Sequence, residues 1–161
     1  MVASSPAFGT AAHELLVGLD VVLHALVGYL LVQYLTPWPP TWGALGGLVP
    51  NLDLPLGLWF QPPLVHRGLV HTPLFMLVVA GALLAGGVQR RRVAAFAVGY
   101  LAELGFDTVE GTDGIMWTYP LSSHHYASPL PVSDAYWIPP LFVVALALVV
   151  YQRTRVESTT A

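Results

Sequence analysis

Long apolar stretches alternate with short polar breaks along most of this chain. Residues 15–35, 69–88, 93–109 and 136–151 are almost entirely apolar, and each approaches the ~20 residues that a helix needs to cross a bilayer. Residues 42–60 form a further apolar stretch, which Pro50 interrupts. The pattern predicts an all-α fold, a polytopic transmembrane helical bundle of about four to five spans, in a single domain over residues 1–161.

The stretch at residues 42–60 is expected to be a broken or re-entrant element. A proline removes a backbone donor and ends a helix, and Asn51 and Asp53 follow Pro50 directly. Irregular backbone at membrane depth is tolerated only where it is buried in protein or lines a cavity. The sequence therefore places polar side chains at the point where a site could form.

Composition supports a membrane protein. Hydrophobic residues make up 55% of the chain and charged residues 9%, against about 25% charged in soluble proteins. A net charge of −3 without a basic stripe argues against a nucleic-acid partner, and the absence of cysteine excludes thiolate sites and disulfides. Membrane lipids are the expected partners, and the oligomeric state is left open.

Arginine placement suggests an orientation. The segment 90–92 and the polar tail 152–161 carry arginines, so both are expected on the cytoplasmic side, with the C-terminus. At 1.5 Å per residue, Asp107 would lie about 22 Å from Arg92, and His71 about 27 Å from Gln89. Asp107 and His71 should therefore reach the same layer, near the non-cytoplasmic face.

Several side chains of this layer suit a metal ion. Imidazoles and carboxylates together bind zinc, and also manganese or iron. Glu103 and Asp107 are four residues apart, so a helix points both the same way. The predicted ligands are His24, Asp53, His66, His71 and Asp107, with Asn51 as a possible addition.

The chemistry expected of this set is hydrolysis. A divalent metal, zinc before manganese or iron, would activate water, and Glu103 could take the proton. Arg67 could hold an anionic group. Purely structural roles are also open for these residues. Arg67 could pair with Glu103 and Asp107 or extend to lipid headgroups. Asp20 could form a local pair beside His24.

The order of these motifs resembles a known family. The chain has His24-Ala25-Leu26, Pro50-Asn51-Leu52-Asp53, His66-Arg67-Gly68 with His71-Thr72, and Gly99-Tyr100 followed by Glu103 and Asp107. This pattern, over roughly residues 20–120, is similar to that of the YdjM-like family of membrane-bound, metal-dependent hydrolases. The resemblance implies a hydrolase of the prokaryotic plasma (inner) membrane without naming a substrate.

The chain departs from that family's pattern at three places. Asn51 replaces the first aspartate of Pro-Asp-Leu-Asp, Val70 and Thr72 replace Thr and Ser, and Glu103 stands where the family often has His. Glutamate can still bind metal or act as a base. Asn51 removes one negative charge, which argues against a two-metal arrangement.

The sequence thus favours a membrane-embedded, metal-dependent hydrolase of a lipid-like, amphiphilic or small-molecule ester or phosphoester. Two other functions use the same residues. Intramembrane His, Asp and Glu also build proton or cation pathways in transporters, and they can simply hold helices together in a non-catalytic assembly protein.

Overall fold

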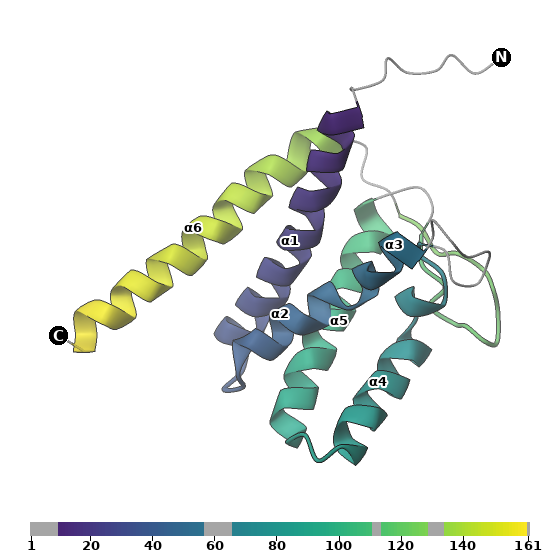
Figure 1. Ribbon diagram of the computed structural model, residues 1–161, viewed down its shortest axis with the longest axis horizontal. Helices are drawn as coiled ribbons and strands as arrows, with labels where there is room; N and C mark the ends of the chain where they lie inside the picture. The colour runs from purple at the N-terminus through teal and green to yellow at the C-terminus, as the bar shows by residue number, and fades with distance from the viewer. Residues whose placement is uncertain (1–9, 57–65, 111–113, 129–133, 161) are drawn as a thin grey trace.

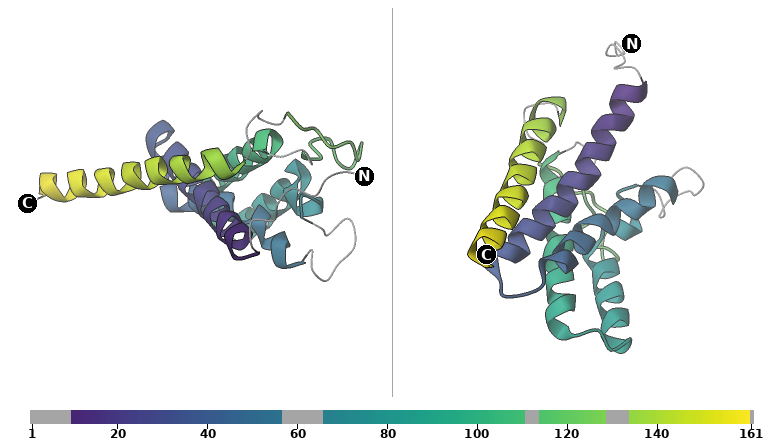
Figure 2. Two further views of the ribbon diagram at one scale, coloured as in Figure 1. Left: turned by 90° about the horizontal axis from the view of Figure 1, so that it is seen from above. Right: turned by 60° about the vertical axis from the view of Figure 1, so that its left-hand side comes forward.

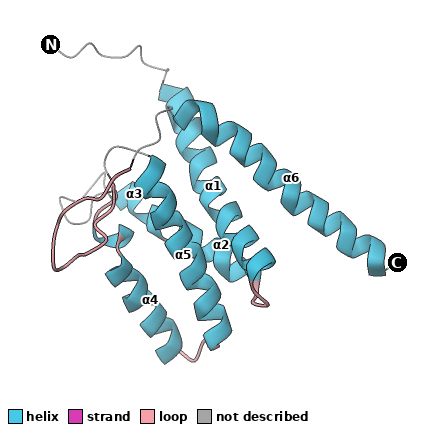
Figure 3. Cartoon of the chain, turned by 180° about the vertical axis from the view of Figure 1, so that it is seen from behind, coloured by secondary structure: helices cyan, strands magenta, loops and turns pink. Residues whose placement is uncertain are grey.

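The computed structural model describes residues 10–56, 66–110, 114–128 and 134–160 (Figure 1). Within these ranges the regular structure is helical, apart from one isolated antiparallel bridge between Ile115 and Tyr126 (Figure 3). The helical elements are α1 Thr10–Leu35, α2 Pro40–Leu48, η1 Pro50–Leu52, α3 Asp53–Leu56, η2 Leu69–His71, α4 Pro73–Ala85, α5 Arg90–Glu110 and α6 Asp134–Thr160.

The predicted all-α class is confirmed, but the predicted number of spans is not. Among the described residues one helix is long and apolar enough to cross a membrane, at Glu14–Leu35 in α1, with a mean hydropathy of 2.3. The apolar helices Pro73–Ala85 and Tyr136–Gln152 are shorter. Pro73 and the turn at Gly86 set the length of α4, and three arginines and three acidic residues reduce the hydropathy of α5.

The predicted break in the 42–60 stretch takes the form of short helical pieces. The chain leaves the α2 helix at Val49, makes one 3₁₀ turn over Pro50–Leu52, and continues into α3. Residues 57–60 of the expected element lie outside the described residues. This break turns Asn51 and Asp53 into the interior, where Asp53 has no exposed surface and Asn51 is 7% exposed.

Helix α2 lies between α1 and α5 and crosses both of them (Figures 1 and 2). Gly43 sits at the crossing, where its backbone contacts Gly28 of α1 and Gly99 of α5. A Cβ atom added to Gly28 would lie 3.0 Å from the carbonyl carbon of Gly43 and 3.2 Å from the Cα of Gly99. Glycines allow helix backbones to approach this closely, so these three residues form what we call the glycine crossing.

The glycine crossing sets the register of the polar residues beyond it. His24 precedes Gly28 by four residues, and Glu103 follows Gly99 by four. Residues four apart lie on the same helix face, one turn along the axis. The crossing therefore brings His24 of α1 and Glu103 of α5 to the same side, where the break after α2 supplies Asn51.

Apolar packing surrounds this arrangement on two sides. In one apolar cluster, Phe96, Tyr100 and Leu104 of α5 pack with Met76 of α4. In a second, Leu23 of α1 packs against Ile138 and Ala145 of α6. Helix α6 lies against α1 near its start and then extends away from the other helices (Figures 1 and 2). Many of its apolar side chains are exposed, as are Leu77 and Val78 of α4.

Candidate metal centre

Asp53, at the start of α3, accepts hydrogen bonds from the ring nitrogens of two histidines. Its Oδ1 lies 2.9 Å from His66 Nδ1 and its Oδ2 lies 2.8 Å from His71 Nδ1. The two imidazole rings stand edge to face, with centroids 5.0 Å apart. Because both carboxylate oxygens are engaged through Nδ1, Asp53 fixes the orientation of the two rings and leaves each Nε2 free to face elsewhere.

Three features fix the backbone around His71: the conformation of Arg67 and two hydrogen bonds. Arg67 adopts φ 60°, a left-handed conformation that is unusual for a residue other than glycine. Thr72 caps α4 by accepting the Phe75 N–H at 3.1 Å, and the Tyr100 hydroxyl donates to the carbonyl of Val70. These contacts fix His71, which has no exposed surface.

The other edge of the His71 ring faces α5. Its Nε2 lies 3.1 Å from Asp107 Oδ2 and 3.2 Å from Glu103 Oε1. Both distances are within ion-pair range, yet among the described residues the Nε2 atom has no hydrogen-bond partner. Three potential ligand atoms thus meet at one buried point.

The electrostatics of His71 and Asp53, which both lie outside the apolar helix α1, reflect these contacts. Burial alone lowers the pKa of His71, but its partners Asp107, Asp53 and Glu103 outweigh that effect and raise the pKa well above its ordinary value. Burial raises the pKa of Asp53, and the bonds to His66 and His71 reverse this and hold it below its usual range. The carboxylates around His71 therefore attract positive charge.

Arg67 supplies the guanidinium of the cluster. Its Nη2 lies 3.0 Å from Asp107 Oδ1 and 3.5 Å from Glu110 Oε2. The Arg67 side chain is 12% exposed, so it is folded back onto α5 and does not extend outward. The contact with Asp107 matches the ion-pair alternative in part, although no Arg67 contact with Glu103 is present among the described ion pairs.

Asn51 links α1 to α5. Its Nδ2 donates to Glu103 Oε1 at 3.2 Å and lies 3.4 Å from His24 Nδ1. A carboxamide can donate to a carboxylate, whereas an aspartate at this position would place a second negative charge there. The Asn51 carboxamide is therefore matched to the Glu103 carboxylate.

Beyond His24 lies a further acidic pair. His24 Nε2 is 3.7 Å from Asp20 Oδ1, one turn earlier in α1, and 3.7 Å from Glu110 Oε2 at the end of α5. Glu110 was not among the residues predicted from sequence, and Asp20 was expected only to pair locally. The spacing of Glu103, Asp107 and Glu110 does place all three on one helix face, so this signal was available.

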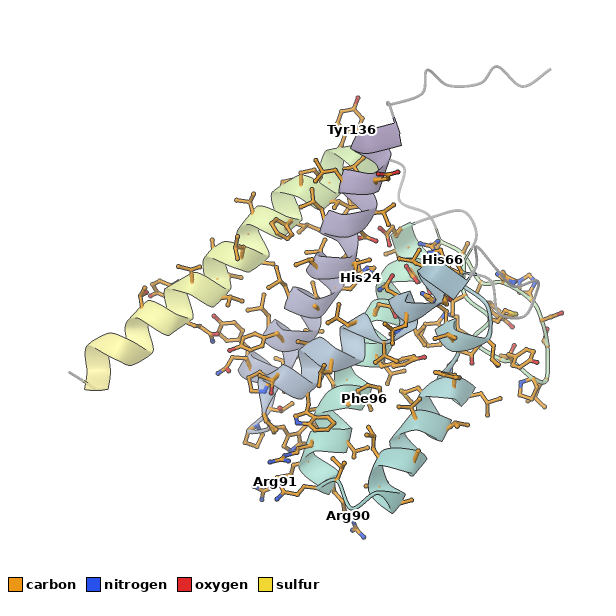
Figure 4. The ribbon with its side chains drawn as sticks, viewed as in Figure 1. His24, His66, Arg90, Arg91, Phe96 and Tyr136 are labelled. Atoms are coloured by element: carbon orange, nitrogen blue, oxygen red, sulfur yellow. The ribbon has the colours of Figure 1, made fainter. Side chains whose placement is uncertain are left out.

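The structure brings all eight predicted site residues into one cluster. In space, this cluster has Asp20 at one end and His66 at the other. Its members come from α1, η1, α3, the turn before α4, and α5; Figure 4 labels His24 and His66 near one end of α5, with Arg90 and Arg91 at the other. We call this set the polar cluster: Asp20, His24, Asn51, Asp53, His66, Arg67, His71, Glu103, Asp107 and Glu110.

Six buried atoms of the polar cluster have no hydrogen-bond partner in the part of the chain that the structure describes. They are Asp20 Oδ1, His24 Nε2, His71 Nε2, Glu103 Oε2, Asp107 Oδ2 and Glu110 Oε2. Buried polar atoms are almost always satisfied, so their gathering is a specific feature. All six are atoms that coordinate divalent metals, and an ion would satisfy several at once.

Three sets of residues within the cluster have ligand atoms close enough to share an ion, and two of the sets have His24 in common. They are Asp53 with His66 and His71, His24 with Glu103 and Asp107, and Asp20 with His24 and Glu110. The donor chemistry, imidazole with carboxylate, fits zinc, manganese or iron. The residues present therefore fit a divalent metal, whose identity the donor set does not fix.

Comparison with known proteins places the chain in a family. No curated protein and no solved structure gave a match. The model of the family described as YdjM inner membrane protein matches residues 19–160, a range that holds every member of the polar cluster and most of the chain. The chain therefore belongs to the YdjM inner membrane protein family.

Proposed function

We propose that this protein is a membrane-embedded, metal-dependent hydrolase of a lipid-like or amphiphilic ester or phosphoester. The observation that carries the proposal is a set of ligand atoms around His71 that have no hydrogen bond within the described residues, among them the buried Glu103 Oε2 and Asp107 Oδ2. Burying such atoms is costly unless a cation meets them. Membership of an inner membrane family and the apolar helix α1 support the location.

The proposed ligands of the ion are His24, His71 and Asp107. Asp53, predicted as a ligand, is better suited to orienting His66 and His71, because both of its oxygens are occupied by Nδ1 atoms. Zinc is the first choice for a set with two imidazoles, followed by manganese or iron. When bound, the ion supplies Lewis acidity and lowers the pKa of water at the site.

The remaining residues would act on the substrate and the water. Glu103 has one oxygen engaged by Asn51 and the other, Oε2, unpartnered, so Oε2 is the atom that would accept the proton from water. Arg67 has donors beyond the Nη2 that contacts Asp107, and these would bind an anionic group such as a phosphate. These are the same roles that the sequence suggested for Glu103 and Arg67.

Access to the cluster is proposed from the side of His66. The His66 side chain is 40% exposed, whereas those of Asp53 and His71 have no exposed surface. Arg67, next in the chain, is mostly buried but not fully so. A substrate would therefore meet His66 and Arg67 before Glu103, and a site in a membrane protein meets lipids and amphiphiles first.

Hydrolysis tests the proposal. Detergent-solubilised protein loaded with Zn²⁺, or separately with Mn²⁺, should hydrolyse fluorogenic ester or phosphodiester lipids in mixed micelles. Glu103→Gln should lose at least about 100-fold in rate, because the general base is removed, while Glu14→Gln, at an exposed position of α1, should not change it. Equal rates for the two variants, or proton-coupled uptake by liposomes without hydrolysis, would contradict the proposal.

We further propose that α4, α5 and α6 complete a bundle in the membrane with the arginines at residues 90–92 on the cytoplasmic side. The exposed apolar residues of α4 and α6 support lipid contact, and the positive charges support the orientation. The cysteine-free chain allows labelling at single introduced cysteines. Arg91→Cys should react from the cytoplasm and Ser122→Cys from outside; the reverse pattern would overturn the orientation.

A further inference from the structure

The polar cluster holds more negative charge than one divalent ion neutralises. It contains five carboxylates, of which four are at least nine-tenths buried, and Asp20 is 19% exposed. Within the described residues their guanidinium partner is Arg67 alone. With neutral imidazoles, four negative charges are left, and one divalent ion leaves two. Buried charge of this kind requires cations close by.

Two of these carboxylates, Asp20 and Glu110, meet at one end of the cluster, where Glu110 Oε2 also lies 3.5 Å from Arg67 Nη2. His24 Nε2 faces Asp20 Oδ1 and Glu110 Oε2 at 3.7 Å from each, and none of the three atoms has a hydrogen-bond partner within residues 10–56, 66–110, 114–128 and 134–160. His24 is 2% exposed and Glu110 is 6% exposed. Distances near 3.7 Å are too long for a hydrogen bond, yet they leave space for an ion about 2 Å from each ligand atom.

We propose that Asp20, His24 and Glu110 hold a second divalent cation beside the first. The proposal extends the proposed hydrolase centre to two ions and rests on the first being bound. One imidazole and two carboxylates suit Mn²⁺, Fe²⁺ or Zn²⁺. Two divalent cations would match the four uncompensated charges, and paired metals can clamp the attacking and leaving oxygens of a phosphoester.

When the second ion is bound, His24 binds it through Nε2, and the first ion keeps His71 and Asp107 as its ligands. A cation on Nε2 leaves the ring proton on Nδ1, which is the atom that faces Asn51 at 3.4 Å. Asn51 Nδ2 keeps its bond to Glu103 Oε1 in that state, so the 3.4 Å contact with His24 Nδ1 would then not be a hydrogen bond.

The expectation that Asn51 argues against two metals does not apply to this geometry. Asn51 lies on the Nδ1 side of His24, whereas the second site lies on the Nε2 side. The charges that form the second site come from Asp20 and Glu110, which the sequence-based ligand set did not include. The competing explanation for their proximity is a single proton shared by the two carboxylates.

Metal counting and electron paramagnetic resonance separate the two explanations. Full-length protein in detergent is stripped with a chelator, reloaded with Zn²⁺ or Mn²⁺, freed of excess ion and analysed by mass spectrometry. Wild type should retain about two ions per chain, and Glu110→Gln about one. Wild type loaded with Mn²⁺ should show a spin-coupled spectrum, which becomes a single-ion spectrum in Glu110→Gln.

The outcomes distinguish this site from the hydrolase centre. One ion in both wild type and Glu110→Gln overturns the second site and leaves the first intact, and two ions in both also overturns it. No ion in wild type overturns both proposals. Circular dichroism checks folding; if Glu110→Gln does not fold, Asp20→Asn, which alters the more exposed carboxylate, decides the question by the same count. Glu14→Gln is the matched control and should keep about two ions.

Discussion

The glycine crossing and the polar cluster occupy successive turns of the same helices, yet they are built on opposite principles. At the crossing, Gly28, Gly43 and Gly99 carry no side chain, and the backbones themselves make contact. One turn further, His24 Nε2 and Glu103 Oε2 are buried without hydrogen-bond partners among the described residues. The crossing fixes where the helices lie without burying any polar side chain. The cluster beyond it buries polar groups whose burial is unfavourable by itself.

This difference predicts how each region responds to change. The crossing leaves no room, so an added atom should disrupt the fold whatever ions are present. The polar cluster concentrates like charges, so its contribution to stability should depend on a bound cation. Substitutions at the crossing and at the cluster should therefore be separable by adding or removing metal.

The largest effect is expected from Gly99→Ala. Its Cβ would overlap the carbonyl oxygen of Gly43, so α2 and α5 must separate, and we expect a loss of about 3 kcal/mol in the free energy of unfolding. The control is Gly105→Ala in the same helix, where a Cβ meets nothing within 4 Å; it should gain about 0.5–1 kcal/mol. Chemical denaturation in detergent measures both, and equal stabilities would show that the helices do not cross through these glycines.

Chelation should produce the next largest effect. An ion bound by the folded protein alone, at about 100 times its dissociation constant, adds about 2.7 kcal/mol to stability. Stripping the ion should therefore lower the melting temperature of the wild type, and adding Zn²⁺ or Mn²⁺ should restore it. The Gly105→Ala variant should show the same shift; an unchanged melting temperature after complete removal of metal would refute a cation-dependent cluster.

Asn51→Asp sharpens the comparison because its effect should change sign with metal. Without metal the new carboxylate replaces a donor 3.2 Å from Glu103 Oε1, so the variant should lose about 1–3 kcal/mol. With metal the added negative charge strengthens cation binding and should offset that loss. Melting curves of the metal-free and loaded forms test this, and an equal loss in both forms would be the contradicting result.

The smallest effect is expected at the exposed edge of the cluster. His66→Ala should weaken metal binding by about 10-fold. The effect should be small because the His66 ring, although Asp53 orients it, lies partly at the surface. His71→Ala should abolish binding, since His71 Nε2 faces both Glu103 and Asp107. Titration of metal-free protein with Zn²⁺ compares the two, and a stronger effect at His66 would reverse the proposed order.

The sequence was sufficient for the helical class and for most of the residues that gather in the polar cluster, but not for Asp20 and Glu110. Apolar runs predict helices, and the four-residue spacing of Glu103 and Asp107 predicts one face, which the structure shows turned toward His71. Pro50 predicts the break in the 42–60 stretch. These features depend on local chemistry, which a single sequence expresses directly.

The rest depends on contacts between distant segments. Glu110 lies at the end of a helix, where its burial depends on α1 and Arg67 and not on its own neighbours. The orienting role of Asp53 follows from two bonds to histidines 13 and 18 residues away. Apolarity alone also overstated the number of clear spans, because Pro73 and the acidic face of α5 shorten or interrupt the apolar runs.

X-ray absorption at the zinc edge tests the central claim, that the polar cluster binds a divalent cation through imidazole and carboxylate, most directly. Zinc-loaded wild type should show nitrogen and oxygen ligands at about 2.0–2.2 Å with the outer-shell scattering of imidazole, and His71→Ala should lose the bound zinc. A wild-type spectrum without imidazole scattering, or one unchanged in His71→Ala, would contradict a metal centre built on this cluster.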